Sequence, residues 1–232
     1  MPKEVVPQQR RRPRGGLPLG AVNVDMATPR YSHSVFLNVP FDDKYRTMFE
    51  ALVFAVHDCG FVARSAFESD DATQVRLAKL FEIIGSSKYG IHDISCTSVD
   101  GIHRLPRFNM PFELGLFMGV KQFGGLIHSR KRGLVLDRER YRYQIFCSDI
   151  AGQDIRAHNN RPSDAIRSVR NWLRASPDTR GKKLPGADYI YRRYQAFRYQ
   201  LPRLRKHFNL DQGDLDFVDY TSLVVGWLKA NP

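Results

Sequence analysis

The sequence has little cysteine, and its three cysteines follow no metal-binding pattern. Cys59, Cys96 and Cys147 lie far apart in a chain of 232 residues and form no CxxC or Cys/His spacing. Their odd number and wide separation argue against a disulfide scaffold, and their spacing argues against a zinc site. We expect no metal ion and no bound cofactor.

Long hydrophobic runs and several well-known catalytic motifs are also missing. Nowhere do eighteen apolar residues follow one another, and the first residues lack the apolar core of a signal peptide. We therefore expect a cytoplasmic protein without a membrane partner. The chain also has no P-loop, no GxGxxG, no HExxH and no evident Ser/His/Asp order.

The composition is that of a folded and strongly basic protein. Hydrophobic residues make up 42% of the chain and aromatic residues 12%, which is enough to build a core. The net charge is +12, and it is not confined to one end of the chain. A positive surface attracts phosphate-bearing partners, which include nucleotides, nucleic acid and anionic membranes.

Residues 1–30 are rich in Pro, Gly and Arg, have no apolar period, and are interpreted as a flexible basic arm. Contact with nucleic acid is an alternative, but the arm has no aromatic residues interleaved with its arginines. We therefore favour a solvated leader. The arm is followed by the main domain, which we place at residues 31–176.

Within the main domain, short apolar runs alternate with segments of helical spacing. Strands are predicted at residues 34–38, 61–66, 89–94 and 134–136, with helical patterns between them. Asp70, Asp71 and Thr73 offer capping oxygens for the second of these helices. Parallel neighbours need crossover helices, so this order predicts an α/β fold: a flavodoxin-like parallel sheet with helices on both faces.

The helix that follows the third strand carries the most distinctive residues. Pro111 suits a first helical turn, and Glu113 would then lie near the positive end of the helix dipole. Gly115 and Gly119 fall on one face, which predicts close packing against a neighbouring element.

Beyond about residue 161 the pattern is helical. One helix is expected to close the main domain, and residues 177–232 are expected to form a helical C-terminal extension.

Three segments in this order resemble the superfamily of nucleoside 2-deoxyribosyltransferases and TIR domains. They are residues 35–41 (VFLNVPF), 87–95 (SKYGIHDIS) and 109–115 (NMPFELG), within a match that spans residues 33–136. Lys79 and Glu82 stand near the place where deoxyribosyltransferases usually carry an additional aspartate. The resemblance implies a TIR-like fold in which Glu113 is the catalytic carboxylate.

The resemblance further implies cleavage of the N-glycosidic bond of NAD or a related nucleotide, by hydrolysis or by transfer. Such relatives often destroy NAD when triggered, which implies a role in bacterial antiviral defence and a homo-oligomer. A carboxylate near the anomeric carbon stabilises the oxocarbenium-like charge or attacks it. Alternatively, Glu113 has a purely structural role as an acidic residue that complements the helix dipole.

Ligands of parallel sheets bind at the carboxyl ends of strands, where the remaining candidates are expected to gather. The substrate-binding candidates are Asn38, Pro40, Phe41, Asp93, Ser95, Arg76, Arg104, Arg107 and Asn109. Asp93 either binds a ribose hydroxyl or caps its own loop. The arginines either bind phosphate or are solvated surface residues.

Two other functions remain open at this point. The first is a non-catalytic nucleotide sensor or TIR-like assembly module that associates through the C-terminal helices. The second is a nucleic-acid binder that uses the basic arm and two Arg/Tyr-rich stretches, residues 138–143 and 189–198. These stretches are explained more simply as helix surfaces, so we do not favour nucleic acid as the partner.

Overall fold

The computed structural model describes residues 29–40, 42–68, 71, 73–97, 108–211 and 215–232. The predicted basic arm lies outside these residues, except for its last two positions. Along the chain, the elements are α1 (Pro29–His33), β1 (Ser34–Asn38), α2 (Arg46–Asp58), β2 (Val62–Arg64), α3 (Arg76–Ser86), β3 (Tyr89–Asp93), α4 (Asn109–Phe123), α5 (Gly125–His128), β4 (Arg132–Asp137), η1 (Arg142–Ile145), η2 (Ser148–Ile150), β5 (Arg156–Ala157), α6 (Pro162–Arg174), η3 (Pro177–Thr179), α7 (Ala187–His207) and α8 (Phe217–Ala230).

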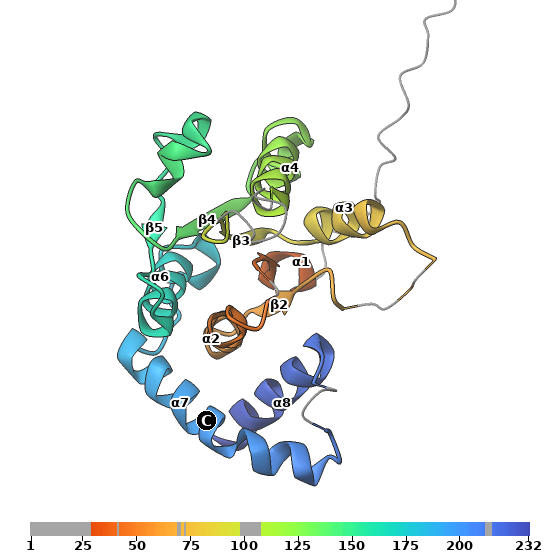
Figure 1. Cartoon of the computed structure of the whole chain (residues 1–232), viewed down its shortest axis with the longest axis vertical. Helices are drawn as coiled ribbons and strands as arrows, with labels where there is room; N and C mark the ends of the chain where they lie inside the picture. The colour runs from red at the N-terminus through yellow and green to blue at the C-terminus, as the bar shows by residue number, and fades with distance from the viewer. Residues whose placement is uncertain (1–28, 41, 69–70, 72, 98–107, 212–214) are drawn as a thin grey trace, which may run out of the picture.

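The described strands form one parallel sheet in the order β2-β1-β3-β4-β5. This is the flavodoxin-like α/β fold that the alternation of strands and helices predicted. The helices α3 and α4 lie on one side of the sheet, and α2 and α6 lie on the other (Figure 1). Strand order reverses between β1 and β3, which is where such sheets bind ligands at the carboxyl ends of their strands.

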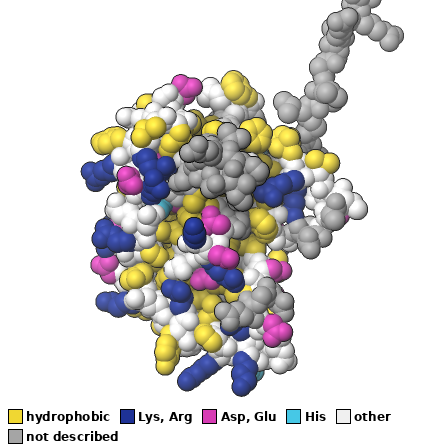
Figure 2. All heavy atoms as spheres, viewed as in Figure 1, with side chains coloured by type: hydrophobic (Ala, Val, Ile, Leu, Met, Phe, Trp, Pro, Cys, Tyr) yellow, Lys and Arg dark blue, Asp and Glu magenta, His cyan; other side chains and the backbone are white. Residues whose placement is uncertain are grey.

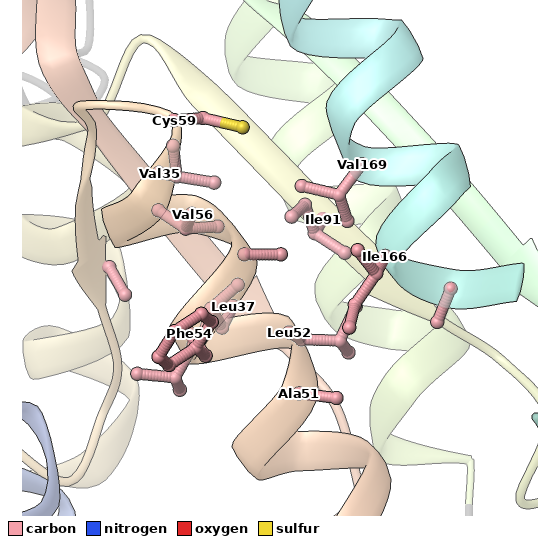
Figure 3. Close-up of a cluster of buried hydrophobic side chains, with 14 of the residues drawn as sticks. Val35, Leu37, Ala51, Leu52, Phe54, Val56, Cys59, Ile91, Ile166 and Val169 are labelled. Carbon is pink, nitrogen blue, oxygen red and sulfur yellow. The ribbon is translucent and has the colours of Figure 1, made fainter. Parts of the chain in front are cut away.

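The larger hydrophobic cluster lies between the sheet and the helix pair α2 and α6. Leu37 and Ile91 from the strands meet Leu52 of α2 and Ile166 and Val169 of α6, all of them fully buried or nearly so (Figure 3). A smaller cluster on the opposite face is built from Phe36, Leu80, Ile83, Ile84 and Phe117. The central strands β1 and β3 are buried at every residue, which explains why their sequences are mostly apolar without a regular alternation.

The two C-terminal helices add another layer outside α2 (Figure 1). The ring of Phe54 in α2 lies 5.7 Å from that of Tyr194 and 5.6 Å from that of Phe197, both in α7. It also lies 5.9 Å from the ring of Trp227 in α8. Apolar side chains of both helices therefore pack into the same cluster as the sheet, in the region where a helical C-terminal extension was predicted.

Three local predictions are wrong. The second strand is shorter than residues 61–66, because β2 lies at the edge of the sheet and pairs only with β1. Asp71 does not cap α3: its carboxylate accepts hydrogen bonds from Thr73, while the residue before the helix is Val75. Asp70 lies outside the described residues.

The third wrong prediction concerns the helix that carries Glu113. A Cβ atom added to Gly115 or Gly119 would meet nothing within 4 Å, so these glycines face open space rather than a neighbouring element. Glu113 is the fifth residue of α4, one position beyond its first turn. None of the helices in the described part of the chain is long and apolar enough to cross a membrane.

Candidate functional site

The carboxyl ends of β1, β3 and β4 each finish in a buried polar residue. Asn38, Asp93 and Asp137 are the last residues of these strands, and each is at most 1% exposed. Parallel strands bring their carboxyl ends to one edge of the sheet, so these side chains share that edge. Buried polar groups require partners, and the partners show what each residue does.

Asn38 connects the end of β1 to the start of α4. Its Nδ2 donates a hydrogen bond to the carbonyl oxygen of Met110 at 2.9 Å and lies 3.1 Å from Nδ1 of His92. Burial lowers the pKa of His92 to about 3, so the ring is neutral and its Nδ1 accepts from the amide. The predicted proximity of the first strand's end to residues 109–113 is therefore confirmed.

Glu113 is a largely buried acidic residue of α4. The residue is only 8% exposed, and its side-chain carboxylate makes no hydrogen bond or ion pair with any residue that the structure describes. Burial raises the pKa of Glu113 to about 7, and the positive charge of Arg76 opposes this effect. A surface acid that complements a helix dipole would be exposed in the first turn, which is not the situation here.

Asp93 is held within the fold rather than presented to a ligand. One carboxylate oxygen accepts from the backbone N–H of Ser95 at 2.8 Å, and the other accepts from the hydroxyl of Tyr45. The second oxygen also lies 3.1 Å from Nε2 of His158. Since Asp93 is fully buried, the loop-capping alternative describes its role, and the ribose alternative has no support in the geometry.

A second buried acid, Asp137, was missed by the sequence interpretation. Its Oδ1 accepts from the guanidinium of Arg142, which also donates to the carbonyl oxygens of Ile94 and Ser95. Burial raises the pKa of Asp137, whereas Arg142 lowers it. The sequence pattern that singled out Asp93 also applies to Asp137, because both residues end an apolar strand. Arg142 and His158 gave no comparable signal.

A pocket of about 600 Å³ opens beside this edge, between the β1–α2 loop, the start of α3 and the start of α8. Its described lining consists of Pro40, Asp42, Asp43, Arg46, Phe49, Glu50, Ala66, Phe67, Asp71, Gln74, Arg76, Lys79, Leu215, Asp216, Phe217 and Tyr220. Acidic and basic side chains are mixed in this lining, and both kinds also gather near the centre of the face shown in Figure 2.

The predicted site residues divide into three groups. Pro40 and Arg76 line the pocket. Glu113 is not in its described lining, but it lies close enough to Arg76 for that charge to affect its pKa. The second group, Asn38, Asp93 and Ser95, is buried beneath the edge of the sheet.

The third group does not contribute to the described pocket. Asn109 is exposed at the start of α4, and Phe41, Arg104 and Arg107 lie outside the described residues. Among the described residues, no group of three or more His, Cys, Asp and Glu side chains is arranged to hold a metal ion.

Comparison of the chain with protein-family models, with curated proteins and with solved structures gave no match. Function is therefore inferred from the geometry of this site and from the resemblance of the three sequence segments.

Proposed function

We propose that this protein cleaves the N-glycosidic bond of NAD or a related nucleotide, with the carboxylate of Glu113 at the anomeric carbon. The observation that carries the proposal is a buried carboxyl group with no described partner, on a helix held against the carboxyl end of β1. A buried acid without a partner destabilises a fold, so a carboxyl group with no described partner, close enough to the pocket-lining Arg76 to feel its charge, favours a functional role.

The chemistry suits a single carboxylate. As the bond from C1′ to the nicotinamide nitrogen breaks, its electron pair returns to the cationic ring, which leaves as neutral nicotinamide. Positive charge develops on the ribosyl carbon, and an ionised Glu113 stabilises it or attacks it. Water then forms the new C1′–O bond and releases a proton, which gives ADP-ribose. No separate acid is needed for this leaving group.

The mixed charges of the pocket are compatible with such a substrate. Arg76 and Lys79 of α3 line one side of the pocket and offer cationic groups for phosphate oxygens. Asp42, Asp43 and Asp216 line other parts and offer acceptors for ribose hydroxyls. A nucleotide that carries phosphates and a cationic base fits this arrangement better than an apolar ligand does.

The test is to incubate the purified chain with NAD and to measure free nicotinamide by chromatography. We expect release by the wild type and its loss in Glu113→Gln, which keeps the shape of the side chain but cannot be ionised. Glu139→Gln is the matched control, because Glu139 is a 67% exposed acid outside the described pocket lining. Equal rates in wild type and Glu113→Gln would show that this carboxylate is not the catalytic group.

A second function, nucleotide sensing without turnover, is favoured by one observation. Glu113 is not part of the described pocket lining, so a ligand in that pocket does not have to contact it. Calorimetric titration with NAD separates the two proposals. A sensor binds NAD equally well before and after Glu113→Gln and releases no nicotinamide, whereas the enzyme releases nicotinamide only with Glu113 intact.

A further inference from the structure

One face of α4 exposes large apolar side chains to solvent. Phe112 is 55% exposed, Phe123 is 86% exposed, and Phe108, immediately before the helix, is 58% exposed. These residues and the two glycines between them, Gly115 and Gly119, recur at helical spacing on the side opposite to the buried Phe117. The result is an aromatic face with a flat centre, which we call the α4 face.

Packing within the described part of the chain does not explain the two glycines. Glycine within a helix is less favourable than alanine by about 1 kcal/mol at each position. A Cβ atom at Gly115 or Gly119 would meet no described atom within 4 Å, so no contact with the described residues requires its absence. Small residues flanked by large ones do allow the backbone of another helix to approach closely.

The side of the sheet that carries the α4 face also lacks an outer layer of helices in the described chain. On the other side of the sheet, α2 and α6 are covered in turn by α7 and α8 (Figure 1). On this side, α3 and α4 have no further layer from the described chain, and Leu77 and Phe81 of α3 are also exposed. Hydrophobic side chains are visible along this part of the molecule in Figure 2.

Charge does not oppose contact between two copies of this chain at the α4 face. The chain carries a net charge of +12, so two copies repel each other over most of their surfaces. The α4 face carries no charged side chain: Glu113 is buried on the opposite side, and Lys121 lies outside the row formed by Phe112, Gly119 and Phe123. This surface can therefore meet its own copy without charge repulsion.

The order of residues on the α4 face is nearly symmetric about Phe117. Gly115 and Gly119 lie two residues on either side of it, with an aromatic residue beyond each glycine, Phe112 and Phe123. An antiparallel pair of such helices places glycine opposite glycine and brings Phe112 of one copy near Phe123 of the other. A two-fold axis requires this kind of self-complementarity, and antiparallel helix dipoles attract.

We propose that the protein forms a two-fold homodimer in which the α4 faces of two copies pack antiparallel, with Gly115 opposite Gly119. The apolar faces of α7 and α8 are buried against α2, so they do not provide this surface. The inference is independent of the proposed reaction, since it depends only on the exposed side of α4.

Self-association is tested by sedimentation equilibrium over a range of concentrations. We expect the wild type to dimerise, and Gly115→Leu combined with Gly119→Leu to weaken the dimer at least about tenfold. Gly226→Leu is the matched control, because Gly226 is also an exposed glycine within a helix with nothing near its Cβ position. It should leave dimerisation unchanged.

Circular dichroism of each variant checks that it is folded. We expect folded variants, because leucine favours an exposed helix more than glycine does. A wild type that stays monomeric at about 100 µM overturns the proposal. Unchanged association in the double leucine variant overturns it too.

The antiparallel arrangement is tested by disulfide cross-linking, which needs Cα atoms within about 7 Å. A mixture of Gly115→Cys and Gly119→Cys chains should form a covalent dimer under mild oxidation, while each variant alone should not. The wild type under the same conditions controls for the three native cysteines. Cross-linking of a single variant with itself, or no cross-link in the mixture, contradicts the antiparallel pair.

Discussion

Replacing Glu113 by glutamine should make the folded protein more stable at alkaline pH. Burial raises the pKa of Glu113 from its ordinary value of 4.5 to about 7. The folded state therefore holds a proton between these two values that the unfolded state has lost. The free energy of unfolding falls as pH rises through this window, and above it the full destabilisation is present.

The size of the effect follows from the two pKa values. A tenfold difference in proton affinity corresponds to about 1.4 kcal/mol, so the shift from 4.5 to about 7 corresponds to about 3 kcal/mol. The free energy of unfolding of Glu113→Gln should exceed that of the wild type by this amount at about pH 8.5. At about pH 4, where both side chains are neutral, the two should be almost equal.

Urea denaturation followed by the fluorescence of the two buried tryptophans, Trp172 and Trp227, measures this difference at each pH. Glu139→Gln, at an exposed acid, serves again as the control. If Glu113→Gln has the same advantage at both pH values, or is less stable at alkaline pH, the argument from burial fails. Such a gain in stability with loss of nicotinamide release is the trade-off expected of a catalytic carboxylate.

Three further predictions follow from the packing and from the site. Gly90→Ala should destabilise the fold by about 1 to 3 kcal/mol in urea denaturation, because its Cβ would lie 2.7 Å from the ring of Phe117. The same change at its strand partner Gly133, where the nearest atom is 3.6 Å away, should have little effect, and equal effects would contradict the steric argument. Phe54→Ala should cost about 3 to 5 kcal/mol on unfolding, since it removes the ring that joins α2 to both C-terminal helices, and a loss below about 1 kcal/mol would refute that role. If Glu113 acts as a carboxylate, kcat/KM for nicotinamide release should rise with pH around 7 and then level off, and a rate that is independent of pH from about 5 to 9 would argue against this role.

The sequence alone determined the fold class. Strand-sized apolar runs such as residues 34–38 and 89–94 lie between helical patterns, and only a parallel sheet with crossover helices accommodates that order. The apolar positions of α6, α7 and α8 were also readable, because helical spacing marks the side that must be buried. Element ends were less predictable, as with Asp71, whose carboxylate is used by a local turn.

The partners of the polar residues were decided by the tertiary structure. Sequence placed Asp93 at a strand's end, but only the folded chain brings Tyr45 and His158 to it from distant segments. The same applies to the two sides of α4. A glycine stripe predicts close packing without saying against what, and burial of Glu113 depends on the surrounding chain. Local sequence patterns indicate which side chains are buried. The protonation state, the pKa and the partners of a polar side chain depend on neighbours far away in sequence.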